Sequence, residues 1–176
     1  MNLTFKSVKL HNFLSYQDAE INLQSRHYCL VSGVNNCIND NASSNGIGKS
    51  TIGSAICWAL TGETIQGIKN EVKNINASDN ECYVELNFNV DNDSYIIIRY
   101  KSPKSDMKII LNGVDISGKG IKESEVILAN HLPDLTLELL ASTIILGQGL
   151  PQKFTSNTPS GRKEILEKLS KSDFMI

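Results

Sequence analysis

Residues 43–51 read SSNGIGKST, a stretch that matches the phosphate-binding pattern G-x-x-x-x-G-K-[ST] except that Ser43 replaces the first glycine. The apolar segment HYCLVSG, residues 27–33, precedes it and predicts a buried strand. After Lys49 the apolar residues recur at helical spacing up to Gly62, which is well placed to end a helix. A strand, a glycine-containing loop and a helix in this order are the context in which the motif binds nucleotide phosphates.

Each residue type has a physical reason to occupy its position in such a loop. Gly46 and Gly48 have no Cβ, so backbone N–H groups can close around phosphate oxygens. The start of the helix adds the positive end of its dipole. We expect Lys49 to reach the β- and γ-phosphates, Ser50 to ligate Mg²⁺, and Thr51 to hydrogen-bond the α-phosphate. The predicted nucleotide-binding residues are Ser43, Asn45, Gly46, Ile47, Gly48, Lys49, Ser50 and Thr51.

The altered first position leaves two versions of the loop open. In one, residues 43–50 form the cradle as they stand, and residues 34–42 of the Asn/Ser-rich insertion at about 34–45 bulge ahead of the phosphates. In the other, Gly33 is the first glycine and residues 36–45 interrupt the motif, because their removal joins GVN to GIGKS. We favour the first version, since a serine at the tight turn costs only about 1 kcal/mol if φ is positive there.

The rest of the chain adds strands, turns and helices around this motif. FKSVKLHNF and AEINL predict two strands, residues 84–90 alternate as a half-buried strand, and the turn DND joins them to YIIIRY as a hairpin. Asn112-Gly113 predicts a second hairpin. Helices are expected at about 122–131 and 135–141, followed by a strand in STIILGQG and a last helix over 159–171. The fold class is α/β with a strong antiparallel component, in one domain covering 1–176.

Composition excludes several classes of function. The net charge of −2 disfavours a broadly basic nucleic-acid surface, and no apolar run approaches the ~20 residues that cross a bilayer. The four cysteines form no C-x-x-C pair, which favours reduced thiols over a metal site. The three arginines, Arg26, Arg99 and Arg162, are scattered, which disfavours a small-molecule kinase with an arginine-rich lid.

An ordered series of segments resembles the SMC-like recombination and repair ATPases of the SbcC type and their bacteriophage relatives. The opening VKLHNFLSYQDAEINL contains an N-F-x-S-[YFH] turn, and STIGSAICWALTGET is similar to the family's segment after the phosphate loop. TIILGQGLPQKFTSNTPSGRKEILEKL resembles the glutamine loop and the helix that leads to a coiled coil. The resemblance implies a P-loop NTPase fold, the N-terminal lobe of an ABC-type ATPase head, with a mixed parallel and antiparallel sheet.

The resemblance also implies roles and partners. Gln148, in a glutamine loop at about 146–150, would sense the γ-phosphate through Mg²⁺ and the attacking water. The expected catalytic residues are therefore Lys49 and Gln148. The expected metal ligands are Ser50 and Gln148. Leu14 departs from the family, which often has Arg or Lys there. ATP and Mg²⁺ are the implied cofactors. The implied partners are a C-terminal lobe, a second copy of the head, an SbcD-type nuclease and DNA, without a membrane.

The expected function is therefore ATP–Mg binding for DNA double-strand-break repair or recombination, in the cytoplasm of a bacterial or phage-infected cell. No Asp-Glu pair follows an apolar run, and ISGKG (residues 116–120) only imitates the family's signature. We therefore expect an ATPase that is incomplete in this chain alone. The alternative is a slow or non-hydrolysing ATP-dependent DNA clamp or organiser of the SMC and RecF group. The presence or absence of a catalytic acid in a second lobe would distinguish the two functions.

Overall fold

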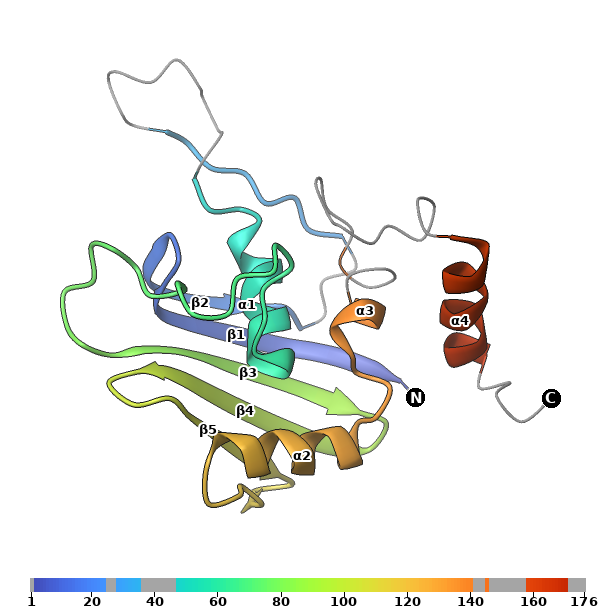
Figure 1. Ribbon diagram of the computed structural model, residues 1–176. Coiled ribbons are helices and arrows are strands. Elements are labelled where there is room, and N and C mark those ends of the chain that lie inside the picture. Colours follow the sequence, from blue (N-terminus) through green and yellow to red (C-terminus); the bar gives the residue numbers. More distant parts are fainter. Residues whose placement is uncertain (1, 25–27, 36–46, 141–144, 146–157, 171–176) are drawn as a thin grey trace.

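The computed structural model describes residues 2–24, 28–35, 47–140, 145 and 158–170, and its centre is a six-stranded sheet (Figure 1). The strand order is β2-β1-β3-β4-β5-β6, and every pair of neighbours is antiparallel. The strands are β1 (Leu3–Phe13), β2 (Tyr16–Asn22), β3 (Cys82–Val90), β4 (Asp93–Ser102), β5 (Asp106–Leu111) and β6 (Val114–Asp115). The antiparallel component is confirmed, whereas the parallel part of the expected sheet is not seen among the described residues.

Both predicted hairpins are confirmed, and residues with positive φ form their turns. Asp91, with φ of 52°, follows β3, and Asn112-Gly113, with φ of 50° and 83°, joins β5 to β6. A side chain links the two turns, because the Oδ1 atom of Asn112 accepts a hydrogen bond at 2.8 Å from Ser94 N, near the start of β4. A turn that places two consecutive residues at positive φ matches the twist of the strands, which is why the Asn-Gly pair occurs here.

The described helices are α1 (Thr51–Thr61), α2 (Ile121–His131), α3 (Leu137–Leu139) and α4 (Pro159–Ser170), close to the predicted positions. Helices α1 and α2 lie on one face of the sheet (Figure 1). Helix α1 ends at Gly62, whose φ of 76° lets its N–H donate to Trp58 O at 2.9 Å.

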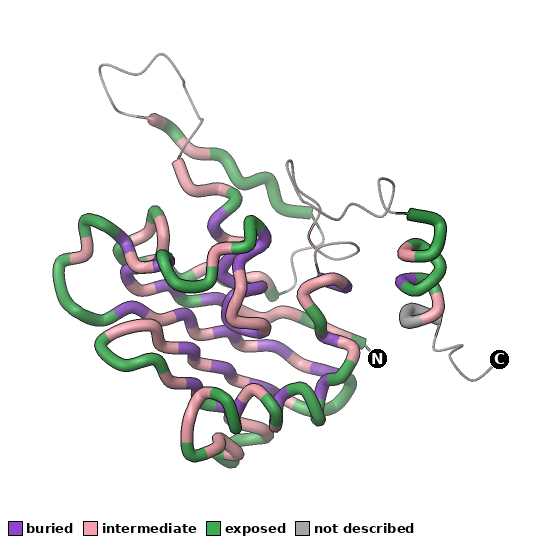
Figure 2. The backbone as a smooth tube through the Cα atoms, in the orientation of Figure 1, coloured by how far each residue is buried: buried purple, intermediate pink, exposed green. Residues whose placement is uncertain are grey.

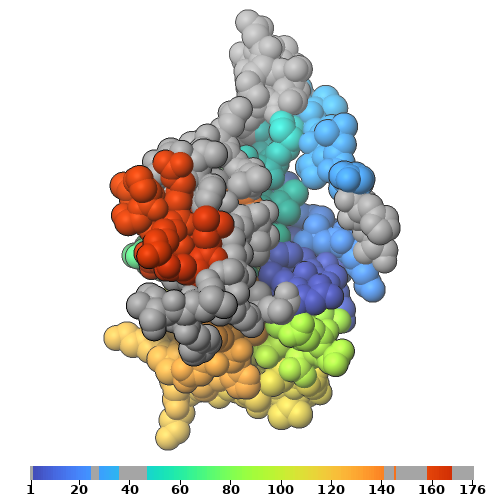
Figure 3. All heavy atoms as spheres, turned by 90° about the vertical axis from the view of Figure 1, so that its right-hand side faces the viewer, coloured from blue at the N-terminus to red at the C-terminus, as the bar shows by residue number. Residues whose placement is uncertain are grey.

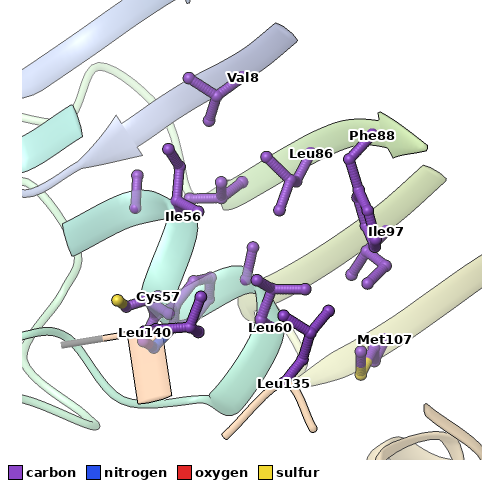
Figure 4. Close-up of a cluster of buried hydrophobic side chains, with 14 of the residues drawn as sticks. Val8, Ile56, Cys57, Leu60, Leu86, Phe88, Ile97, Met107, Leu135 and Leu140 are labelled. Carbon is purple, nitrogen blue, oxygen red and sulfur yellow. The ribbon is translucent and has the colours of Figure 1, made fainter. Parts of the chain in front are cut away.

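The core lies between this helical face and the sheet, where Figure 2 shows buried positions alternating along the strands. Strand β3 contributes Val84, Leu86 and Phe88, all fully buried, while the residues between them are half-buried on the other face. Helix α1 is buried from Ser54 to Leu60, and Figure 4 shows Ile56 and Leu60 beside Leu86. This packing fixes α1 against the sheet and so sets the position of its first turn.

The strand predicted over 27–33 is not confirmed. Residues 28–33 form no strand, and Tyr28 and Leu30 are almost fully exposed, Leu30 at 92%. In Figure 3 residues 28–35, in light blue, lie at the surface. An apolar sequence becomes a strand only where a neighbouring strand pairs with it, and no described strand does so here. The strand expected in STIILGQG falls almost entirely outside the described residues.

Candidate functional site

A pocket of about 680 Å³ opens at the N-terminal end of α1. That volume is within the usual range for small-molecule sites. Its walls come from the turn between β1 and β2, the start of α1, and the segment that follows α1. The lining residues are Leu14, Ser15, Ile47, Gly48, Lys49, Ser50, Thr51, Ser54, Gln66, Ile68, Glu71, Lys73 and Ile75.

Gly48 occupies a position that accepts no side chain. Its φ is +87°, a backbone conformation that L side chains rarely adopt. A Cβ atom at this position would also collide with the hydroxyl of Ser15. The carbonyl of Gly48 accepts a hydrogen bond from Thr51 N at 3.0 Å, which starts the turn that becomes α1. The positive φ is the main reason for glycine here, and the Ser15 side chain would also have to move to admit a Cβ atom.

Ser50 is the N-cap residue of α1, and its exposed hydroxyl makes no capping hydrogen bond to the helix. A serine N-cap usually accepts from a backbone N–H, so this hydroxyl is left available to a ligand. Lys49, half-buried, stands one residue earlier and lines the same pocket. A lysine and a hydroxyl at the positive end of a helix are suited to phosphate oxygens and a hard cation.

One wall of the pocket carries residues that no sequence motif marks. The segment after α1 folds back beside the phosphate loop, where Ser54 Oγ donates to Gln66 Oε1 at 2.8 Å. Further along, Leu14 N donates to Val72 O at 2.7 Å, and Phe13 and Lys73 form an isolated antiparallel bridge. Residues 66–75 have no helical or strand periodicity, so only their packing places them at the site.

The structure brings five of the predicted nucleotide-binding residues to this pocket, namely Ile47, Gly48, Lys49, Ser50 and Thr51. Ser43, Asn45 and Gly46 lie outside the described residues. Gly33 lies against Ile47, so a Cβ at Gly33 would collide with that side chain. The residues that flank the segment 34–46 are therefore close together.

Gln148 also lies outside the described residues, but Ile145, three residues earlier, lies beside α1. A Cβ at Gly53 would fall 3.0 Å from Ile145 Cγ2. Leu14, where the SMC-like family often has Arg or Lys, lines the pocket with an apolar side chain. The pocket therefore receives no cation from this position.

No helix among the described residues is long and apolar enough to cross a membrane. The same residues contain no group of three or more His, Cys, Asp or Glu side chains arranged to hold a metal ion. Ser50 offers the pocket a hydroxyl oxygen, a ligand type suited to Mg²⁺.

The fold and the site together define the class of phosphate-loop nucleotide-binding proteins. A family described as "AAA domain" matches residues 7–174, and the chain belongs to this family. The resemblance to the SMC-like repair ATPases is likewise confirmed by similarity to curated relatives.

Two of these relatives are named "DNA double-strand break repair Rad50 ATPase". The protein of Methanocaldococcus jannaschii is 26% identical over 170 residues, which cover 96% of this chain and 15% of the relative. That of Thermoplasma acidophilum is 27% identical over 92% of this chain and 17% of the relative. The chain thus spans less than a fifth of the length of these relatives.

Among solved structures, "Structure of the recombination mediator protein RecF-ATP in RecFOR pathway" matches with a TM-score of 0.46 and 16% identity. The match covers 98% of this chain and 40% of that one.

Proposed function

We propose that this chain is the ATP–Mg²⁺-binding lobe of a DNA double-strand-break repair ATPase. The observation that carries the proposal is the meeting of Lys49, Ser50 and Thr51 in one pocket at the start of α1. The names of the Rad50 relatives support the DNA-repair role. In this proposal Lys49 neutralises phosphate charge and Ser50 holds Mg²⁺, which supplies further neutralisation when bound.

Gln148 is proposed to act on the γ-phosphate side of the bound nucleotide. Support comes from Ile145, which lies against the first turns of α1, because three residues span at most about 10 Å. We expect Gln148→Ala to leave ATP affinity nearly unchanged and to slow hydrolysis in a head assembled with its second lobe. Equal turnover of Gln148→Ala and the parent head would remove Gln148 from the mechanism.

A second lobe is proposed to complete the head, and a second head and a nuclease subunit to act with it on DNA. Support comes from the exposed apolar side chains of residues 28–34, which include Tyr28, Leu30 and Val34. Exposed apolar segments of this kind mark surfaces for association. In amide hydrogen exchange, residues 28–34 should become protected when the lobe is part of a complete head. Unchanged exchange there would contradict the proposed contact.

The nucleotide-binding proposal is tested by titration calorimetry with ATP and Mg²⁺. Lys49→Ala should weaken binding by about 10- to 100-fold, since it removes a charge-assisted hydrogen bond to phosphate. Lys69→Ala is the matched control, because Lys69 pairs with Glu63 at 3.0 Å and does not line the pocket. We expect negligible hydrolysis by this chain alone.

Two outcomes would contradict the proposal. The first is equal ATP affinity of the parent and Lys49→Ala, which would show that the pocket does not bind the phosphates. The second is a robust steady-state ATPase rate of the pure chain that Lys49→Ala abolishes, which would show that no second lobe is needed.

A further inference from the structure

The turn between β1 and β2 makes a direct contact with the first turn of α1. Ser15, in this turn, places its Oγ atom 3.0 Å from Thr51 Oγ1, and either hydroxyl can be the donor. Ser15 is exposed, whereas Thr51 is buried, and both line the same pocket. The Ser15 hydroxyl also occupies the space beside Gly48 where a Cβ would stand. Ser15 is thus in contact with the phosphate loop although 33 residues separate it from Gly48 in the chain.

Hydrogen bonds of the residues just before Ser15 hold the backbone that carries it. Asn12 is fully buried, and its Nδ2 atom donates to Asp79 Oδ1 at 2.8 Å and to Glu81 O at 2.9 Å. The carbonyl of Asn12 accepts from Asn74 N at 2.8 Å, and Leu14 N donates to Val72 O. These bonds fasten the β1 side of the turn to residues 72–81, which include the end of the pocket wall.

The direction of the Ser15–Thr51 hydrogen bond depends on which hydroxyl donates its proton. A hydroxyl has one proton to donate, so only one of the two donates in the Ser15–Thr51 bond. Phosphate oxygens are acceptors, and Thr51 can therefore serve a phosphate only by donating its own proton. The bond to Ser15 then requires Ser15 to be the donor. A bound phosphate would fix the direction of this hydrogen bond.

We propose that Ser15 is a positioning residue, whose hydroxyl donates to Thr51 Oγ1 and aims the Thr51 proton at a nucleotide phosphate. This inference rests on the proposed function. Without Ser15, the Thr51 hydroxyl would lose the donor that fixes the direction of its own proton and could rotate toward another acceptor. The phosphate would then compete with an internal acceptor. Ser15 acts through Thr51 and needs no contact of its own with the nucleotide.

The test is a double-mutant cycle on ATP–Mg²⁺ affinity with Ser15→Ala, Thr51→Val and the double variant. Ser15→Ala should weaken binding about threefold to tenfold, the effect of one neutral hydrogen bond, and Thr51→Val about 10- to 100-fold, since it removes a hydrogen bond to a charged phosphate. The double variant should bind no more weakly than Thr51→Val, because Ser15 acts only through that hydroxyl. Ser15→Thr, which keeps a hydroxyl, should restore most of the affinity. Ser105→Ala, an exposed serine outside the pocket, is the control.

A readout with two ligands separates this role from a general effect on the fold. If Thr51 contacts the α-phosphate, Ser15→Ala should weaken ATP and ADP binding by the same factor, because both ligands carry that phosphate. Ser15→Cys, close in size and a poor donor, repeats the measurement in a variant that retains the volume of the side chain. All variants are compared only where they melt as cooperatively as the parent.

Three results would overturn the inference. Unchanged ATP affinity of Ser15→Ala and Ser15→Cys, with Lys49→Ala impaired, would exclude the role of Ser15 and leave the proposed function intact. If the double variant lost ATP affinity by the product of the two single-variant factors, Ser15 would not act through Thr51. A parent chain that binds neither ATP nor ADP would overturn the proposed function, and this inference with it.

Discussion

Arg99 carries a buried charge beneath the end of α1, and removing its partner should measurably destabilise the fold. Arg99 is 2% exposed and lies on β4. Its Nε atom donates to Ala59 O at 3.0 Å, and its Nη1 atom donates to Glu125 Oε1 of α2 at 2.6 Å. Burial lowers the pKa of Arg99, while the hydrogen bond and charge of Glu125 raise it. The change to make is therefore Glu125→Ala, which leaves the guanidinium in place without its carboxylate.

The expected loss lies between two limits. Removing one partner of a fully buried pair costs about 3–5 kcal/mol, whereas an exposed pair contributes about 0–1 kcal/mol. The Glu125 side chain is 43% exposed, so water can approach the vacated position and replace part of the interaction. We expect Glu125→Ala to cost about 2 kcal/mol of unfolding free energy, or roughly 4–8 °C in Tm for a chain of this size. Glu125→Gln should cost about half as much, because its amide oxygen can still accept from Arg99.

The assay is urea unfolding followed by the fluorescence of Trp58, the only tryptophan, which is buried in α1 next to Arg99. Lys122→Ala, an exposed change on α2, is the control. The urea midpoint should fall for Glu125→Ala while the slope of the transition stays constant. A Glu125→Ala midpoint equal to that of Lys122→Ala would show that the Arg99 charge is already satisfied by other means, and the reasoning would be wrong.

Two further predictions concern titratable side chains. His11 Nδ1 lies 2.6 Å from Asp18 Oδ1, and His11 Nε2 lies 3.2 Å from Asp79 Oδ2. The hydrogen bond to Asp18 raises the pKa of His11, and the nearby Asp79 raises it further, while partial burial of the ring opposes the rise. The stabilisation of the fold by protonated His11 is complete below the ordinary pKa of about 6.5 and disappears as pH rises through the higher pKa of the folded state. Over that pH range the urea midpoint of the parent should fall relative to that of His11→Gln. Parallel pH profiles of the two proteins would contradict this prediction. Burial raises the pKa of Cys57 to about 12 and that of Cys82 to about 11, so both thiols should resist a disulfide reagent at pH 8 until the chain unfolds. Rapid labelling of either cysteine in the native chain, located by peptide mass analysis, would show that it is not buried.

Much of the fold could be predicted because its signals are local. The alternation in β3 and the Asn112-Gly113 pair determine their structures with little help from distant residues, and both were predicted correctly. Helix α1 was equally clear, since its apolar residues recur at helical spacing and Gly62 ends it.

The rest depends on contacts that a local pattern cannot contain. Residues 28–33 have the composition of a strand, yet a strand requires a partner, and the described chain supplies none. The wall formed by Gln66 and Lys73 was missed because their segment has no periodicity and reaches the site through its backbone bonds to the β1–β2 turn. Ser15 belonged to a recognised turn, but its bond to Thr51 joins positions 36 residues apart.

The pairing of β1 with β3 has a consequence for how the chain tolerates changes in length. Once β2 has paired with β1, this pairing closes a loop over residues 23–81, roughly 60 residues that contain the phosphate loop and α1. The entropy of such a closure grows only with the logarithm of loop length. The ten residues from Asn36 to Asn45 therefore add only about 0.2 kcal/mol to the cost of closing it. An insertion of this size would be far more costly in the tight turn between β5 and β6, where two residues fix the register of the hairpin. Chain entropy thus leaves the surroundings of the phosphate loop open to insertions and deletions that the hairpins of the same sheet exclude.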